Sequence, residues 1–119
     1  MTDSLLVQLR KGVLDMCVLA LLAQRDGYAY DIASRLAHDI GMGEGTIYPL
    51  MRRMQADGLV KTYLAESSSG PPRKYYQLTR AGHAALAAQE AEWNAFIAGV
   101  AKVMSDGPPS SAKFAGAGR

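Results

Sequence analysis

Residues 41–58 read GMGEGTIYPLMRRMQADG, a glycine-rich turn followed by a run with helical periodicity. The apolar side chains of the run recur at the three-and-four spacing of a helix with one buried face: Ile47, Leu50, Met51 and Met54. Pro49 has no amide hydrogen and is tolerated only near the start of a helix, so we expect the regular part to begin at Thr46. Asp57 and Gly58 end the run. The pattern predicts a helix with a single core face.

The opposite face of this predicted helix carries small and basic groups: Gly45, Pro49, Arg52, Arg53 and Ala56, with Thr46 and Tyr48 beside them near its N-terminal end. The major groove of DNA is about 12 Å wide and admits a helix whose outward face is not bulky. In that position Arg52 and Arg53 can donate to guanine edges or to phosphates. The alternative is that both arginines lie on an ordinary solvated helix face.

Two helices are expected before this run. Residues 5–23 contain no proline, and the stretch 13–23 is apolar except for Asp15. A helix that is apolar nearly all round needs cover on two sides, by its own domain and by a second body. Residues 28–40 place Ile32 and Leu36 on one face and charged groups elsewhere, which predicts a second, shorter helix.

Two strands are expected after the run, at residues 60–65 and 74–78, where side chains alternate between two faces. Tyr75 and Tyr76 must then point to opposite faces, so at most one of them is in the core. Residues 66–73 form a polar loop that is too long for a tight hairpin and is expected to project into solvent. This order of elements is typical of a winged helix-turn-helix, in which the wing contacts phosphates near the recognition helix.

Arg73 and Lys74 are the candidate phosphate ligands of the wing. They follow Gly70-Pro71-Pro72, which limits the freedom of the loop and so reduces the entropy lost when a cationic tip is ordered against DNA. The alternative is that they are edge-strand charges that discourage aggregation.

Thr79 is expected to cap a long helix over residues 79–105. A mostly apolar stripe runs along three heptads of this helix and includes Trp93, Phe96, Ile97 and Val100. The tail 106–119 lacks the apolar content to order itself and is expected to be disordered. We therefore expect a mainly α fold with a small two-stranded β wing: a winged helix-turn-helix domain at 5–78, a C-terminal dimerisation helix at 79–105 and the tail.

The composition excludes several function classes. The chain has 119 residues and a net charge of +2, and its basic surplus lies in residues 43–80, with six basic and three acidic side chains. No segment is long and apolar enough for a membrane span, and the N-terminus does not resemble a signal peptide, so we expect a soluble cytoplasmic protein. Cys17 is alone, and His38 and His83 lack ligand spacing. We expect no enzyme activity, no metal and no cofactor.

Several separated blocks resemble the signature of PadR-type transcriptional regulators. They are residues 45–54 (GTIYPLMRRM), 57–60 (DGLV), 70–79 (GPPRKYYQLT) and 81–82 (AG), within a resemblance that covers roughly residues 9–104. The resemblance implies a regulator, usually a repressor, that binds a pseudo-palindromic double-stranded DNA operator as a homodimer. It also implies that the basic helix, Tyr48, Arg73 and Lys74 contact DNA. Glu44 stands where a small hydroxyl or neutral residue is expected, and its role stays open.

The same resemblance implies that the last helix packs across the N-terminal helix of a partner copy. In the multidrug-sensing branch of the family, a tryptophan at the corresponding place lines a pore at the dimer interface and stacks planar aromatic compounds. Trp93 is then the candidate stacking residue, with Phe96, Ile97 and Val100 expected at the same dimer pore, or else Trp93 is a packed interface residue. Asp15 would lie near the pore and attract a cationic ligand, or else it is a surface or partner-paired charge. The alternative function is a winged-helix module that binds protein without specific DNA binding.

Overall fold

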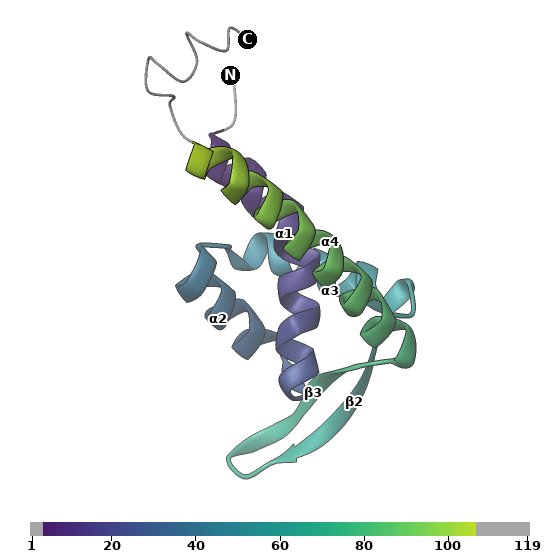
Figure 1. Cartoon of the computed structure of the whole chain (residues 1–119). Coiled ribbons are helices and arrows are strands. Elements are labelled where there is room, and N and C mark those ends of the chain that lie inside the picture. The colour runs from purple at the N-terminus through teal and green to yellow at the C-terminus, as the bar shows by residue number, and fades with distance from the viewer. Residues whose placement is uncertain (1–3, 107–119) are drawn as a thin grey trace, which may run out of the picture. The chain divides into compact units, whose positions relative to one another are not determined.

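The computed structural model describes residues 4–106, which form four α-helices and three β-strands (Figure 1). In chain order they are α1 (Leu5–Gln24), β1 (Gly27–Tyr28), α2 (Ala29–Ile40), α3 (Glu44–Ala56), β2 (Val60–Ser67), β3 (Gly70–Leu78) and α4 (Arg80–Asp106). The mainly α fold with a β wing is confirmed. The expected disordered tail lies, apart from Asp106, outside the described residues.

The N-terminal helix α1 forms over almost the predicted range. The Val7 amide donates to Ser4 Oγ at 3.1 Å, which caps the first turn. Toward its C-terminal end the helix is buried on the face that carries Leu14, Val18 and Leu22. Near its start Leu5 remains largely exposed, so the winged-helix unit covers only part of this apolar helix.

The helix α3 begins two residues before the expected start at Thr46. The carbonyl of Gly43 accepts hydrogen bonds from the amides of Thr46 and Ile47 at 3.1 and 3.2 Å, which closes the first turn from Glu44 onward. Pro49 therefore lies inside the helix and deprives the Gly45 carbonyl of its amide partner. Gly45 is exposed, so water can satisfy that carbonyl and the proline is tolerated.

The sheet has three antiparallel strands in the order β1-β3-β2. The strands β2 and β3 form the expected two-stranded wing, and β1 adds a third strand that the sequence did not predict. The extra strand is the two-residue β1, in which Gly27 pairs with Tyr76 and Tyr28 pairs with Tyr75. A two-residue strand has no periodicity of its own. It exists only because β3 supplies the partner.

The expectation of a loop at residues 66–73 is wrong, because most of these residues belong to the strands β2 and β3. Ser67 pairs with Gly70 across a two-residue turn, and Ala65 pairs with Arg73. The ladder is irregular between these two pairs, and this irregularity accommodates Pro71 and Pro72, which cannot donate hydrogen bonds. The segment is exposed, as expected, but as a hairpin arm.

The junction between β3 and α4 is closed by Thr79. Its amide donates to the Leu59 carbonyl at 3.1 Å, and its hydroxyl accepts from the Gly82 amide at 3.0 Å, so the predicted cap is confirmed. Gly82 is buried against Leu59, and a Cβ on Gly82 would collide with the Leu59 carbonyl oxygen. The start of α4 is thereby fixed against the end of the α3–β2 turn.

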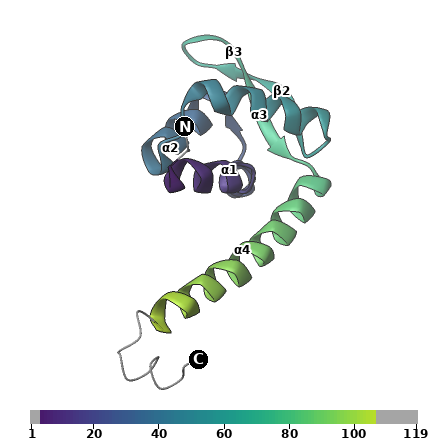
Figure 2. The ribbon, with the colours of Figure 1, turned by 90° about the horizontal axis from the view of Figure 1, so that it is seen from above.

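One apolar core joins the helices, the sheet and the first two turns of α4. Its buried members are Leu14, Val18, Leu19, Leu22, Ile32, Ala33, Leu36, Met42, Ile47, Leu50, Met51, Met54, Val60, Tyr76, Leu78 and Leu86. The chain separates into two compact units, and the boundary lies between Ala87 and Ala88. This boundary falls within α4, which is one continuous helix (Figure 2). Within residues 4–106 no helix is long and apolar enough to cross a membrane.

Candidate nucleic-acid interface

The helix α3 separates its buried and exposed faces as its periodicity predicts. Ile47, Leu50, Met51 and Met54 are in the core. Of the predicted DNA contacts on this helix, Thr46, Pro49 and Arg52 are exposed, and Tyr48 is half-buried against the core. Glu44 is exposed in the first turn, where a carboxylate interacts favourably with the helix dipole.

The two arginines of α3 differ in their surroundings. Arg53 donates through Nη2 to Asp15 Oδ2 of α1 at 2.7 Å, and the two side chains are 57% and 44% exposed. Arg52 has no ion-pair or hydrogen-bond partner among residues 4–106. The structure therefore brings together Arg53, predicted to bind DNA, and Asp15, predicted to face an effector, and leaves Arg52 available.

The predicted wing cations lie on opposite faces of β3, and both are exposed. The Arg73 guanidinium lies 4.7 Å from the centre of the Tyr28 ring, and Lys74 Nζ lies 5.6 Å from that of Tyr76. Tyr76 is only 5% exposed, whereas Tyr75 is half-buried. This settles the open choice between the two tyrosines, since Tyr76 is the core residue.

Three tyrosines form a row on the sheet face opposite the core. The ring of Tyr75 packs edge-to-face against the ring of Tyr28, with 5.5 Å between the ring centres, and stacks on the ring of Tyr63, with 5.7 Å between the ring centres. The Tyr63 hydroxyl donates to Asp26 Oδ2 at 2.6 Å, and this hydrogen bond raises the pKa of Tyr63 above its ordinary value. Desolvation raises the pKa of Tyr28, although the nearby Arg73 acts in the opposite direction.

Tyr28, Tyr63 and Asp26 were not predicted as site residues. The available signal was the aromatic residue in each of the three segments, but the strand register that aligns them is not readable from the chain. On the other flank of the wing, Gln55 of α3 donates to Thr62 Oγ1 of β2 at 3.4 Å, which links the predicted recognition helix to the base of the hairpin.

The predicted effector residues of α4 lie in the unit that begins at Ala88. Trp93 is half-buried, and Phe96, Ile97 and Val100 are exposed. An apolar groove of about 470 Å³ runs along this part of the helix; it is lined by Ala95, Phe96, Gly99, Val100, Val103 and Met104. Trp93 is not among the lining residues.

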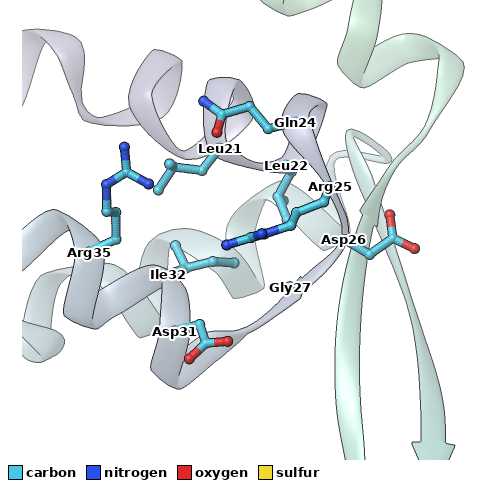
Figure 3. Close-up of a pocket in the computed structure, with 9 residues that line it drawn as sticks. All are labelled: Leu21, Leu22, Gln24, Arg25, Asp26, Gly27, Asp31, Ile32 and Arg35. Carbon is cyan, nitrogen blue, oxygen red and sulfur yellow. The ribbon is translucent and has the colours of Figure 1, made fainter.

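A second pocket of about 290 Å³ lies between the end of α1, β1 and the start of α2 (Figure 3). Its floor is apolar, formed by Leu21, Leu22 and Ile32, and the Arg25 side chain extends across it. Arg35, also on its rim, is paired with Asp39. None of these residues was predicted as a site residue. Within residues 4–106 no group of three His, Cys, Asp or Glu side chains is placed to hold a metal ion.

Comparison with known proteins identifies the family. The model of the transcriptional regulator PadR-like family matches residues 18–88. The chain belongs to this family. The PadR-like regulator from Bacillus cereus is 36% identical, with a TM-score of 0.76, over 82% of this chain and 96% of that one. The PadR family regulator from Eggerthella lenta is 38% identical, with a TM-score of 0.71, over 82% and 87% of the two chains.

The PadR resemblance and the winged-helix fold expected from the sequence are thus confirmed. The fold is also shared with Bacillus subtilis PadR, a protein solved in complex with operator DNA, at 23% identity and a TM-score of 0.58 over 65% of this chain and 46% of that one. At 23% identity this comparison shows only that the two proteins share a fold.

Proposed function

We propose that this PadR-like regulator is a ligand-responsive repressor that binds a pseudo-palindromic operator as a homodimer. The helix α3 enters the major groove, and the β2–β3 hairpin lies along the neighbouring phosphates. The observation that carries the proposal is the exposed face of α3, where Pro49 and the unpaired Arg52 stand opposite four core side chains. A helix with this profile can approach base edges closely and donate to them.

The charge distribution supports the proposal that α3 and the hairpin form the DNA-binding surface. Arg73 and Lys74 are exposed on the hairpin, and each is held over an aromatic ring. Residues 43–80 carry six basic and three acidic side chains. Contacts to phosphate from these groups give affinity that falls with salt, and contacts from α3, including Thr46 and Tyr48, give sequence preference.

Two exposed apolar surfaces support the homodimer. On α1 the surface consists of Leu5, Leu6 and Leu9, and on α4 it consists of Phe96, Ile97, Val100, Val103 and Met104. Apolar stripes of this length on helices are stabilised when another apolar surface removes them from water. We propose that a second copy of the chain supplies that cover, which also provides the two-fold symmetry of the operator.

We place the effector of the proposed repressor on the dimer-forming helices. Trp93 offers a ring for stacking a planar aromatic compound, with Phe96, Ile97 and Val100 on the same stripe and Asp15 as the acid. Calorimetric titration with a planar cationic dye tests this assignment. Trp93→Ala is expected to abolish the binding heat, and an unchanged affinity would remove Trp93 from the site.

The central experiment is fluorescence anisotropy with labelled DNA from the promoter of the protein's own gene, across a salt series. Specific binding is expected, and Arg52→Ala is expected to weaken it by about 1–3 kcal/mol while leaving the dimer intact. The matched control is Lys102→Ala, which removes the same charge from an exposed site on α4. Absent or sequence-independent binding would instead favour a protein-binding winged helix.

A further inference from the structure

We propose that Tyr28 is a positioning residue that holds Arg73 of the wing in place for a DNA phosphate. The inference rests on the proposed DNA binding and extends it to a residue at the start of α2. The observation behind it is the Arg73 guanidinium at 4.7 Å from the centre of the Tyr28 ring, at the end of the tyrosine row described above.

Strand register builds this arrangement. Tyr75 of β3 is paired with Tyr28 on one side and with Tyr63 on the other, so the three rings stand in one line across the sheet. Arg73 is two residues from Tyr75 and therefore shares its face. Because β1 ends at Tyr28, the ring beside Arg73 belongs to the residue at which the chain turns into α2.

The row is fixed at its far end. Asp26, adjacent to β1, accepts from the Tyr63 hydroxyl at 2.6 Å and from Gln77 Nε2 at 3.3 Å. These bonds connect β2 and β3 to the segment that carries Tyr28. The ring of Tyr28 contacts Tyr75 of β3, and the segment that carries it is tied to both β2 and β3.

The type of contact leaves Arg73 able to bind. A guanidinium over an aromatic face keeps its N–H donors at its edge, where they can form a bidentate pair with a phosphate. Among residues 4–106 Arg73 makes no ion pair and no hydrogen bond that would occupy those donors. Arg53 differs, because its Nη2 already donates to Asp15. Tyr28 thus restricts the rotamers of Arg73 before DNA arrives and reduces the entropy lost on binding.

The test is a double-mutant cycle on promoter DNA, measured by anisotropy across a salt series. Tyr28→Ala is expected to weaken binding about two- to fivefold, the range of an exposed cation–π contact, without changing the salt slope. Arg73→Gln is expected to reduce the slope by about one, because one phosphate contact is lost. In the Arg73→Gln protein, Tyr28→Ala is expected to change nothing further.

Three variants separate positioning from other roles of Tyr28. Tyr28→Phe keeps the ring and is expected to bind as the wild type does. Equal weakening by Phe and Ala would show that the hydroxyl, which is hydrogen-bonded to Asp31, matters instead of the ring, and would overturn the inference. Tyr28→Leu keeps apolar volume and replaces the Ala variant if that one loses thermal stability. Lys74→Gln, next to Arg73 on the other strand face, is expected to combine multiplicatively with Tyr28→Ala.

A readout without DNA separates this inference from the proposed function. In NMR spectra of the free protein, the Arg73 δ protons are expected to be shifted upfield by the Tyr28 ring in the wild type and in Tyr28→Phe, but not in Tyr28→Leu. A wild type that fails to bind DNA while showing this shift would contradict the function alone. Normal DNA binding with independent effects of Tyr28 and Arg73 would contradict the positioning role alone.

Discussion

Arg52 and Arg53 are neighbours in the chain but have different surroundings, so we expect them to contribute differently to the proposed DNA interface. Arg52 is exposed and unpaired among the described residues, whereas Arg53 is held by Asp15 from a different helix. Asp15 occupies Nη2 of Arg53 and places a negative charge beside the guanidinium, which opposes the approach of a phosphate. We therefore expect Asp15 to limit the contribution of Arg53 to the proposed DNA binding.

Replacing Asp15 by asparagine is expected to tighten binding of promoter DNA several-fold and to steepen the salt slope by about one, because Arg53 becomes available to a phosphate. Anisotropy across a salt series measures both quantities. The loss of an exposed ion pair is expected to lower the free energy of unfolding by no more than about 1 kcal/mol.

Asp106→Asn is the control for this prediction, since it removes the same charge at the end of α4. An equal gain in both variants would indicate only a general charge effect. Weaker binding by Asp15→Asn would mean that Asp15 orients Arg53 for DNA instead of withholding it.

At the scale of elements, the helices were predictable because their periodicity is local. Ile47, Leu50, Met51 and Met54 define the buried face of α3 without knowledge of their partners. The strand β1 was not predictable, because it depends on Tyr75 and Tyr76, far along the chain. The two strands of the hairpin are predicted, but residues 66–73 between them are expected to form a loop because the stretch is long, polar and rich in turn-forming residues. Only the pairing partner reveals the irregular ladder that accepts Pro71 and Pro72.

The same limit applies to the candidate site. The small and basic face of α3 and the cations of the wing follow from residue type and spacing. The pairing of Asp15 with Arg53 does not, because 38 positions separate them and neither belongs to a pattern shared with the other. Tyr28 was missed for the same reason, since its contact with Arg73 exists only after the sheet has formed.

Within α4 two glycines are expected to respond oppositely to alanine. Gly82→Ala places a Cβ against the Leu59 carbonyl and 2.9 Å from Leu78 Cδ2, and overpacking of this kind costs about 1–3 kcal/mol or more. Gly99→Ala meets nothing within 4 Å and is expected to stabilise the helix by about 0.5–1 kcal/mol. Urea unfolding at one protein concentration measures both. Destabilisation by both variants to the same extent would show that the contact with Leu59 is unimportant.

At the scale of the whole molecule, we propose that dimerisation depends on the apolar stripe of α4. Val103 is 70% exposed within the chain, and Val103→Glu is expected to convert the dimer to a monomer in sedimentation velocity, because a carboxylate buried in an apolar interface is strongly unfavourable. Ala98→Glu adds the same charge to an exposed position off that stripe and is expected to leave the dimer intact. A wild type that sediments as a monomer at micromolar concentration would contradict the homodimer.

The burial of Gly82 and Leu86 in the winged-helix core has a consequence for folding during synthesis on the ribosome. The core around α1 is still incomplete when α3 has been synthesised, because Tyr76, Leu78 and Leu86 are missing from it. The nascent chain must emerge to the second turn of α4 before its N-terminal helix is enclosed. Until then Leu14, Leu19 and Leu22 of α1 lack part of the core that buries them in the folded chain, which exposes apolar surface during synthesis.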